Sequence, residues 1–433
     1  MKNTFYISCP IDTYSGYGAR SRDFVKSLIK SEKYDVKILP QRWGGTPFGF
    51  IDDHISNWGF LKSHIIELKN GKIDQQPDIW CQITVPNEFQ KVGKFNIGLT
   101  AGIETNLCSA HWIEGCNRMD LILTSSKHSK TVFEESKFTA INNKTGEQIP
   151  IELTTPCEVL IEGADLDVYK PLQTPMTNDD LFQSINSIQE SFAYLYVGHW
   201  MQGEFGHDRK NVSLLIKAFF ETFKNQLNPP ALILKASNGV SSYMSREDLL
   251  GRILKIRKTV KGNKASVYLL NGDLTDSEMN ELYNHPKVKS MVSLTKGEGF
   301  GRPLLEFSLT GKPIMVSGWS GHTDFLHPKY NFLLPGKLEK IHPSAANQWL
   351  IAESSWFKPD EPHIGSSLKE IFKNYRKVLK KTTKQSQHAK NKFSFNKMKK
   401  LISNLLTSNL PYFPKQVELN IPKISLPKLK KVK

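Results

Sequence analysis

The sequence predicts an α/β protein made of two Rossmann-like domains that face each other across a cleft. Short apolar segments alternate with amphipathic segments of helical periodicity through most of the 433 residues, a pattern typical of parallel sheets whose strands are joined by helices. The alternation is interrupted by a polar segment without clear periodicity, residues 172–190, and then starts again. A chain of this length can form two domains of ordinary size, so we interpret residues 172–190 as an interdomain linker.

The first half of the chain opens with an apolar segment over residues 3–9, which we predict to be the first strand. Residues 15–20 (SGYGAR) predict a flexible loop, in which Gly16 and Gly18 either allow the backbone to approach a ligand closely or make a plain β–α turn. A helix is expected over about residues 21–31. Further strands are expected over residues 34–39, 79–85, 95–99, 121–124 and 159–161.

The second half repeats the pattern. Ser245 with Asp248, and Thr275 with Glu278, have the spacing of capping boxes, so each pair predicts the start of a helix. The strands predicted in this half include residues 194–198, 231–236, 265–270 and 313–318, and the helices include residues 211–224 and a basic helix over about residues 369–381.

Residues 296–324 contain the most informative motif of the chain. An apolar run over residues 290–294 predicts a buried strand that leads directly into the glycine-rich residues 297–301 (GEGFG). Pro303 suits the first turn of a helix, where its missing N–H would have no partner in any case, and Gly311 ends that helix. A strand, a glycine-rich loop and a helix in this order predict a site for an anion such as a diphosphate.

Two carboxylates, Glu298 and Glu306, flank this loop at an interval of eight residues. A phosphate site that carries its own carboxylates most simply uses them on hydroxyl groups, which points to sugar chemistry; an ordinary solvated acid pair is the alternative interpretation. The segment E-G-F-G-R-P-L-L-E between them resembles the E-x7-E signature of retaining glycosyltransferases with the GT-B fold. Residues 95–105 (FNIGLTAGIET) also resemble glycosyltransferases of large tailed bacteriophages.

The resemblance extends over about residues 1–406. Residues 196–198 (YVG) and 209–211 (RKN) are similar to the first strand and cationic loop of the second domain in this family, although His199 stands where relatives often have an arginine. Residues 393–398 are similar to a late helix that crosses back to the first domain. The resemblance implies an N-terminal acceptor domain over residues 1–171, the linker over 172–190, a nucleotide-sugar domain over 191–390, the crossing helix over 391–410 and a basic tail over 411–433.

The resemblance and the chemistry of a nucleotide-sugar donor together imply roles for individual residues. The diphosphate leaving group gains charge as the glycosidic bond breaks, and Arg209 and Lys210 are expected to stabilise it. Glu298 is expected to contact the transferred sugar and Glu306 the ribose. The implied catalytic residues are Glu298, Arg209 and Lys210; the donor-binding residues are Gly299, Phe300, Gly301, Arg302, Glu306, Gly18 and Tyr17; and the acceptor-side residues are Glu104, Thr105 and His322. Glu104 is equally consistent with an ordinary loop acid, and His322 with a loop turn.

No cofactor and no metal ion are expected beside the nucleotide sugar, which we expect to be a UDP-sugar. Asp165 and Asp167 form a D-x-D sequence, the metal pair of another glycosyltransferase fold, but they lie in the segment that leaves the first domain. Arg209 and Lys210 already neutralise the diphosphate. Because no carboxylate is obvious as a nucleophile, the resemblance implies attack on the face from which the leaving group departs, with the leaving phosphate accepting the proton of the acceptor.

The net charge of +16 arises at the C-terminal end of the chain. Residues 1–365 hold 40 Lys/Arg and 40 Asp/Glu, whereas residues 366–433 hold 18 Lys/Arg against Glu370 and Glu418. This distribution indicates an anionic partner, such as nucleic acid or an acidic membrane surface, or else a solvated basic helix followed by a solubilising tail.

Cysteine content and hydropathy indicate the cellular compartment of the protein. Five cysteines, an odd number without metal-ligand spacing, indicate reduced, buried thiols. Residues 1–10 are too short and polar for a signal peptide, and no run approaches the roughly 18–20 apolar residues of a membrane span. We therefore expect a cytoplasmic protein, in the host cytoplasm if the chain is viral.

Three interpretations are open for the acceptor, and we favour DNA that carries 5-hydroxymethylcytosine. The basic C-terminal region would bind phosphates by counterion release, with the basic helix near the cleft and with Phe393, Phe395 and Tyr412 as base-stacking groups. The second interpretation is a cell-envelope or lipopolysaccharide acceptor with peripheral membrane contact. Such enzymes usually have a basic first domain, whereas residues 1–200 hold 19 Lys/Arg against 24 Asp/Glu. The third is a non-catalytic nucleotide-sugar or nucleic-acid binding module, which the intact Glu298 and Glu306 disfavour.

Overall fold

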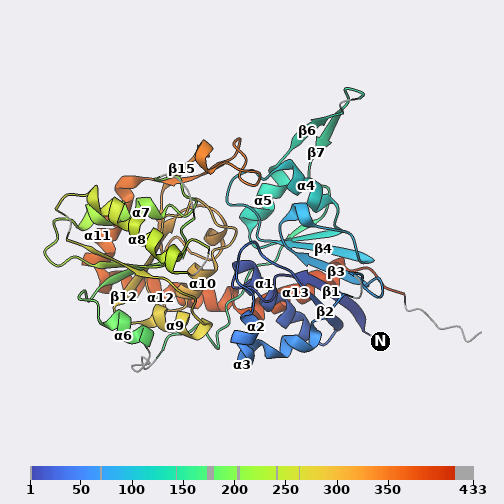
Figure 1. The fold of residues 1–433 in the computed structure, drawn as a ribbon, viewed down its shortest axis with the longest axis horizontal. Helices are drawn as coiled ribbons and strands as arrows, with labels where there is room; N and C mark the ends of the chain where they lie inside the picture. Colours follow the sequence, from blue (N-terminus) through green and yellow to red (C-terminus); the bar gives the residue numbers. More distant parts are fainter. Residues whose placement is uncertain are drawn as a thin grey trace, which may run out of the picture.

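The computed structural model describes residues 2–68, 71–142, 144–172, 180–201, 205–239, 242–262 and 264–414, which form two α/β domains side by side (Figure 1). Each domain is organised around a six-stranded sheet, in the order β2-β1-β3-β4-β5-β8 in the first and β11-β10-β9-β12-β13-β14 in the second. Every neighbouring pair within these sheets is parallel, so the chain must cross over between strands, and helices supply most of the crossovers. The prediction of an α/β protein with two Rossmann-like domains is confirmed.

The first domain carries its helices on both faces of its sheet. Its parallel strands are β1 (Asn3–Cys9), β2 (Tyr34–Pro40), β3 (Ile79–Ile83), β4 (Phe95–Thr100), β5 (Leu121–Thr124) and β8 (Cys157–Val159). Its helices are α1 (Gly16–Ile29), α2 (Phe50–Asp53), α3 (Ile55–Trp58), α4 (Ala110–Asn117) and α5 (Lys127–Glu135), with short 3-10 turns η1 (Gly59–His64) and η2 (Pro86–Glu88). An antiparallel hairpin, β6 (Phe138–Ile141) and β7 (Gln148–Ile151), projects from this domain (Figure 1).

The second domain repeats the arrangement with a strand order typical of dinucleotide-binding folds. Its strands are β9 (Ala193–His199), β10 (Ala231–Ser237), β11 (Ser266–Leu270), β12 (Val288–Ser293), β13 (Ile314–Ser317) and β14 (Phe332–Leu334). Its helices are α6 (Asp180–Asn186), α7 (Val212–Phe223), α8 (Tyr243–Lys258), α9 (Asp276–Asn284) and α10 (Arg302–Ser308), with the 3-10 turn η3 (Gly321–Asp324).

A strap that follows β14 connects the second domain to the first. It consists of the antiparallel strands β15 (Gly336–Lys340) and β16 (Ser355–Pro359), with the turn η4 (Pro343–Ala345) between them. The backbone N–H of Asn106 donates to the carbonyl of Ser355 at 2.9 Å, and the Ser355 N–H donates to Asn106 Oδ1 at 2.6 Å. Trp349 of the strap packs near Trp112 of α4, with ring centroids 6.1 Å apart. The two domains are therefore joined on this side as well as through the chain between them.

The C-terminal helices return the chain to the first domain. They are α11 (Glu361–Lys373), α12 (Tyr375–Lys392) and α13 (Phe395–Asn409). Met398, Ile402 and Leu406 of α13 are buried in the core of the first domain beside α1. The predicted crossing helix is thus present. Of the predicted basic tail, Phe413 is still buried in that core, while residues 415–433 lie outside the described residues.

Several local predictions agree with the structure. The first strand and the strand at residues 121–124 have the predicted bounds. Thr275 and Glu278 form both hydrogen bonds of a capping box at the start of α9. All five cysteines are buried free thiols. No described helix combines the length and apolar character needed to cross a lipid bilayer.

Other local predictions were wrong, each for a local reason. Residues 15–20 are not a flexible loop, because the Ser15 side chain accepts from the Gly18 N–H and starts α1 at Gly16. The cap of α8 is Ser242, three residues before the predicted Ser245. The last strand of the first sheet is residues 157–159 rather than 159–161.

Two longer segments also differ from the prediction. The basic segment is not one helix over residues 369–381, because Asn374, with φ −110° and ψ 26°, separates α11 from α12. The predicted linker, residues 172–190, contains helix α6, with Leu181 and Ile185 buried. Residues 173–179 of that linker lie outside the described residues.

Candidate active site

The glycine-rich loop between β12 and α10 lies where the second domain meets the first. Gly301 precedes α10 as its N-cap with φ 94°, a left-handed conformation that favours glycine. The loop is fixed from behind: the Glu298 N–H donates to Ser320 Oγ at 2.9 Å, and the Glu298 carbonyl accepts from the Gly321 N–H at 2.9 Å. The Glu298 side chain therefore starts from a backbone position held on both sides.

Glycines of this loop also allow the two domains to touch. A Cβ on Gly297 would lie 2.0 Å from the carbonyl oxygen of Glu104, and a Cβ on Gly299 would lie 2.4 Å from the carbonyl oxygen of Ala101. Both contacted residues follow β4 of the first domain. Because no side chain fits at these distances, both glycines are required for the approach of one backbone to the other.

Two cations from the loop before α7 meet two carboxylates at this interface. Arg209 forms an ion pair with Glu104 at 2.6 Å, which joins the two domains, and Lys210 forms an ion pair with Glu298. The loop that carries both cations is held by Asp208, whose buried carboxylate accepts two hydrogen bonds from the start of α7. Four residues that the sequence placed in the active site thus form one charged cluster, which we call the Arg209–Lys210 cluster.

Burial and charge act in opposite directions within this cluster. Burial alone would raise the pKa of Glu298, but Lys210 and Arg209 outweigh it and hold that pKa below its ordinary value. Burial lowers the pKa of Lys210, and the neighbouring Arg209 lowers it further although Glu298 opposes both. The carboxylate is therefore held ionised, and the two adjacent cations favour the approach of a further anion.

A second charged cluster joins the domains around Arg302. Its guanidinium pairs with Asp23 of α1, lies 3.8 Å from Glu162 after β8, and contacts Glu306 one turn along α10 at 2.8 Å. Burial opposes the charge, but the three carboxylates raise the pKa of Arg302 above its ordinary value. Arg302, predicted to bind the donor, thus directs its N–H groups at protein carboxylates on both sides of the interface.

Glu306, the second glutamate of the motif, is buried, with only 6% of its surface exposed. Its carboxylate accepts from Arg302 Nε and from the Tyr283 hydroxyl at 3.2 Å. Burial raises the pKa of Glu306 to about 7, although Arg302 lowers it. At neutral pH this carboxylate is close to its titration midpoint, unlike Glu298.

Tyr17 and Gly18 lie in the first turn of α1, on the first-domain side of the interface. The Tyr17 hydroxyl shares a hydrogen bond of 2.9 Å with Thr100 Oγ1 and accepts a second one from the Ala101 N–H at 3.0 Å. Because the Ala101 carbonyl meets the glycine-rich loop, Tyr17 lies one residue away from that loop. Gly18 is buried, and a Cβ there would lie 2.4 Å from the Thr13 carbonyl oxygen, so this glycine packs the turn.

Three predicted site residues have side chains engaged elsewhere. Phe300 packs in the core of the second domain, and only its backbone belongs to the loop. Thr105 is fully buried and donates to the Leu107 carbonyl at 2.7 Å, so its hydroxyl does not face the cleft. His322 is fully buried beneath the loop, with Nε2 2.6 Å from the Ser317 carbonyl, and burial lowers its pKa.

The D-x-D sequence is used inside the first domain. Asp165 pairs with Lys26 of α1 at 3.0 Å and accepts from the backbone N–H of Asp167 at 3.1 Å. Lys26 and this hydrogen bond hold the pKa of Asp165 below its ordinary value although burial opposes them. This carboxylate therefore already has a cationic partner within its own domain.

Two features predicted to bind DNA do not lie beside the charged clusters. Phe393 and Phe395 are buried at the crossing point, with 8% and 7% exposure, so their predicted role in base stacking is wrong; Tyr412 is exposed. Helix α12 contacts the C-terminal end of α10, where its Thr382 hydroxyl donates to the Gly311 carbonyl at 2.8 Å. The glycine-rich loop is at the opposite end of α10, so the basic helix does not lie beside it as predicted.

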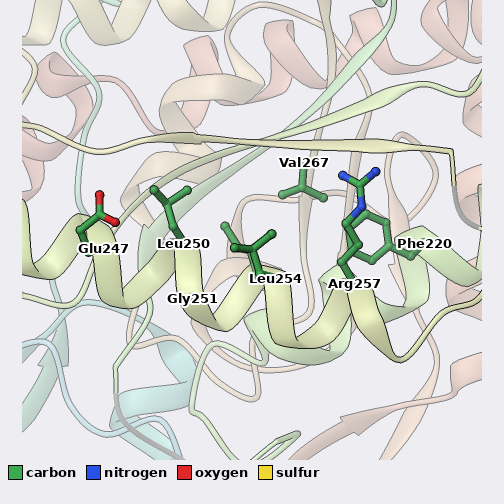
Figure 2. A pocket seen from close by; sticks show the side chains of 8 residues that line it. Phe220, Glu247, Leu250, Gly251, Leu254, Arg257 and Val267 are labelled. Atoms are coloured by element: carbon green, nitrogen blue, oxygen red, sulfur yellow. The ribbon is translucent and has the colours of Figure 1, made fainter.

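A surface hollow of about 320 Å³ on the second domain is separate from these clusters (Figure 2). Leu250, Leu254 and Val267 line it, with Glu247 and Arg257 at its two ends (Figure 2). It opens on α8, beside the edge strand β11, and shares no residue with the charged clusters. A hollow of this composition has no concentration of positive charge for a diphosphate, so it is not the donor site.

Sequence reasoning missed several residues that the structure brings into the site. Asp23 and Glu162 hold Arg302 from the first domain, Tyr283 binds Glu306, and Ser320 fixes the backbone of Glu298. Asp23 lies 279 residues from its partner along the chain, and no periodicity or spacing links the two. Only the packing of one domain on the other could have identified this cluster.

Comparison with known proteins identifies the fold. Neither a family model nor a curated protein sequence matches the chain. Among solved structures, HepE of Anabaena in complex with UDP-glucose is 14% identical with a TM-score of 0.61, covering 94% of this chain and 100% of that chain. A glycosyltransferase from Rickettsia africae is 13% identical with a TM-score of 0.58, covering 94% and 99%. Sucrose-phosphate synthase from Thermosynechococcus elongatus is 10% identical with a TM-score of 0.58, covering 94% and 99%. The chain has the GT-B fold, as the sequence predicted.

Proposed function

We propose that this protein is a retaining glycosyltransferase that transfers a sugar from a UDP-sugar to a hydroxyl group without a metal ion. The observation that carries the proposal is the Arg209–Lys210 cluster, in which two adjacent cations and Glu298 meet at the glycine-rich loop. Two cations at one place suit a diphosphate, and an ionised carboxylate beside them suits sugar hydroxyls. The GT-B fold and the UDP-glucose bound in HepE of Anabaena support a UDP-sugar as the donor.

Donor binding exchanges the partners of these cations. The diphosphate takes up hydrogen bonds from Arg209 and Lys210, whose present partners, Glu104 and Glu298, are single carboxylates. An anion that carries more charge competes well with them. Glu298, released from Lys210 but still close to both cations, then accepts hydroxyl groups of the transferred sugar.

During the chemical step, negative charge grows on the diphosphate beside the same two cations. The bond between the anomeric carbon and the diphosphate oxygen breaks, and the acceptor oxygen bonds to that carbon while its proton moves to the departing phosphate oxygen. The charge on the leaving diphosphate grows during this step, so Arg209 and Lys210 interact more strongly with the transition state than with the bound donor. In the donor complex Glu298 and Glu104 stay close to Arg209 and Lys210, and this positive charge weakens both carboxylates as nucleophiles and favours attack from the leaving-group face.

The acceptor that the charge distribution favours is DNA containing 5-hydroxymethylcytosine. Helices α11 to α13 carry twelve Lys and Arg residues between Lys369 and Lys400, and within the described residues none of them forms an ion pair with a carboxylate. Most of these cations are exposed, and unpaired cations of this number suit a polyanion. Because α12 contacts the end of α10 opposite the glycine-rich loop, DNA bound to the α12 cations would reach the site around the side of the protein, as a flipped or single-stranded base.

The experiment that tests the proposal combines the full-length protein with tritiated UDP-sugars and either hydroxymethylated or plain DNA. We expect sugar transfer to 5-hydroxymethylcytosine, detected by mass spectrometry of digested nucleosides, and none to unmodified cytosine. Transfer to a saccharide or lipid-linked acceptor instead would replace DNA by an envelope acceptor. Absence of both transfer and donor hydrolysis across the common UDP-sugars would contradict the glycosyltransferase itself.

A further inference from the structure

An aromatic pair stands at the edge of the first domain beside the candidate active site. Trp43, in the connection between β2 and α2, stacks on Tyr17 of α1, with ring centroids 4.0 Å apart and an interplanar angle of 22°. Trp43 is only half-buried. Its neighbours Gly44 and Gly45 are exposed, and a Cβ on either would meet nothing within 4 Å, so the space around this part of the connection is open.

The connection that carries Trp43 is held in place at both ends. The Gln41 N–H donates to the Cys9 carbonyl at 2.8 Å at its start. At its end, Asp12 accepts from the Ile51 N–H at 2.7 Å and also from the Gly49 N–H at 3.2 Å. Within it, the Thr46 N–H donates to the Trp43 carbonyl at 3.0 Å. Trp43 is therefore presented by an ordered turn, which lowers the entropy lost when a ligand stacks on it.

A short series of contacts joins this pair to the reacting centre. The Tyr17 hydroxyl, at the far edge of the ring on which Trp43 stacks, accepts from the Ala101 N–H at 3.0 Å. The Ala101 carbonyl in turn faces Gly299, where a Cβ would lie 2.4 Å from it. Trp43 is thus separated from the glycine-rich loop by one aromatic ring and one residue, a spacing suited to an acceptor that reaches toward a sugar bound there.

We propose that Trp43 is the platform on which the acceptor base stacks, with Tyr17 supporting the indole from behind; this inference rests on the proposed function. A third flat ring added to an existing stack of two is the arrangement by which proteins hold single-stranded bases. Arg42, exposed beside Trp43, supplies a cation near the phosphates of such a strand. Burial of Phe393 and Phe395 removes two of the three stacking groups that the sequence suggested, and Tyr412, the third, is exposed near the C-terminal end of the described chain. Trp43 offers a stacking group beside the glycine-rich loop.

A nucleobase fits this surface better than a sugar ring. Saccharide sites surround their aromatic platform with side chains that bond to hydroxyl groups. Residues 43–49 (WGGTPFG) offer one hydroxyl side chain, Thr46, and a second exposed aromatic ring, Phe48, which is 46% exposed. A base needs few such partners, because stacking on its face supplies most of the attraction.

Binding of a single-stranded oligonucleotide containing 5-hydroxymethylcytosine tests the platform. With UDP present, we expect Trp43→Leu to weaken binding, measured by fluorescence anisotropy, by about 5- to 150-fold. Trp43→Phe, which keeps an aromatic face, should weaken it much less. Tyr243→Ala is the matched control, because Tyr243 is an exposed aromatic residue on α8 of the second domain, at 73% exposure, and should not affect binding.

The outcomes separate this inference from the proposed function. Trp43→Leu should weaken oligonucleotide binding far more than it changes the KM of UDP-sugar hydrolysis, because the substitution leaves the Arg209–Lys210 cluster intact, and Tyr243→Ala should change neither. Unchanged oligonucleotide affinity in Trp43→Leu would overturn the proposed platform. The proposal would also fail if the protein bound a neutral oligosaccharide through Trp43 and did not bind the oligonucleotide. Absence of hydrolysis in the unaltered protein, with Trp43-dependent oligonucleotide binding, would remove the glycosyltransferase and leave the platform standing.

Discussion

At the domain interface Arg209, Lys210 and Arg302 each face a carboxylate, whereas within the described residues the cations of α11 to α13 have no carboxylate partner. Arg302 contacts three carboxylates, and Arg209 and Lys210 contact one each. The helical cations between Lys369 and Lys400 are mostly exposed and without described acidic partners. The two regions thus place similar residues in opposite environments.

The difference shows where charge determines structure and where it is available for a partner. A buried charge that loses its counter-charge is left in a medium that solvates it poorly, so the interface must keep its pairs or exchange them for a ligand. An exposed cation is solvated by water and contributes little to stability. Substitutions in the interface should therefore change stability or catalysis, and substitutions on the helices should change only the response to salt.

Removal of Arg302 is the strongest way to break the interface. In Arg302→Leu, Asp23, Glu162 and Glu306 remain buried together without a counter-charge, and we expect the free energy of unfolding to fall by about 3–5 kcal/mol. Denaturant unfolding followed by circular dichroism measures this change. Arg376→Leu on α12 removes an exposed guanidinium and should leave the unfolding midpoint unchanged. A similar small effect for both substitutions would show that the cluster does not hold the domains together.

The sequence predicts the parts of this picture that depend on neighbours along the chain. β1, the capping box of α9 and the turn at Gly301 follow from local apolar runs, side-chain spacing and a required left-handed residue. The pairing of Arg209 with Glu104 depends on how one domain packs on the other, which no local pattern encodes. The burial of Phe395 escaped prediction for the same reason, because α13 packs its apolar face on a domain formed by the opposite end of the chain.

Arg209→Ala should affect catalysis more than donor binding. The positive charge interacts most strongly with the diphosphate as it leaves, so we expect kcat to fall by about 10²- to 10³-fold while donor KM changes less. Steady-state kinetics with a UDP-sugar measure both quantities. Arg209→Lys keeps the charge without the planar fork and should be intermediate, and Arg246→Ala, at an exposed arginine of α8, should have no effect.

Activity in the presence of a chelator tests the same proposed role of Arg209 and Lys210. In the mechanism that we propose, Arg209 and Lys210 supply the positive charge at the diphosphate, so the unaltered protein should remain active in excess EDTA. A loss of activity that added metal restores would contradict the metal-independent mechanism, whatever the effect of Arg209→Ala.

The two glutamates of the motif should respond differently to pH. Burial raises the pKa of Glu306 to about 7, so its carboxylate is mostly protonated below that pH and ionised above it. Arg302, Asp276 and Tyr283 face this carboxylate. In the donor complex that we propose, only the ionised form of Glu306 could accept hydrogen bonds from two ribose hydroxyl groups. We therefore expect donor KM to fall by up to about tenfold as pH rises from 6 to 8.

Glu306→Gln should abolish this pH dependence and raise donor KM at pH 8 toward the value of the unaltered protein at pH 6. Glu298, whose pKa is held low by Lys210 and Arg209 after burial is overcome, should contribute no change in this range. Glu247→Gln, at an exposed glutamate of α8, is the control. A KM independent of pH in the unaltered protein would remove Glu306 from the donor site.

The smallest effect on the stability of the folded protein is expected for the exposed cations of α12. Replacing Lys377, Lys380 and Lys384 of α12 by glutamine removes three exposed charges with no described carboxylate partner, so the unfolding midpoint should not move. DNA binding should weaken, and the slope of log affinity against log salt should decrease by up to about 0.9 for each phosphate that the protein no longer neutralises. The matched control replaces the exposed Lys255 and Lys258 at the end of α8 and the exposed Lys261 just after it, so that both triple variants have the same net charge. If both triple variants lower the slope equally, DNA responds only to total charge and the C-terminal helices are not its binding surface; if only the α12 variant does so, the unpaired charges mark where the strand lies.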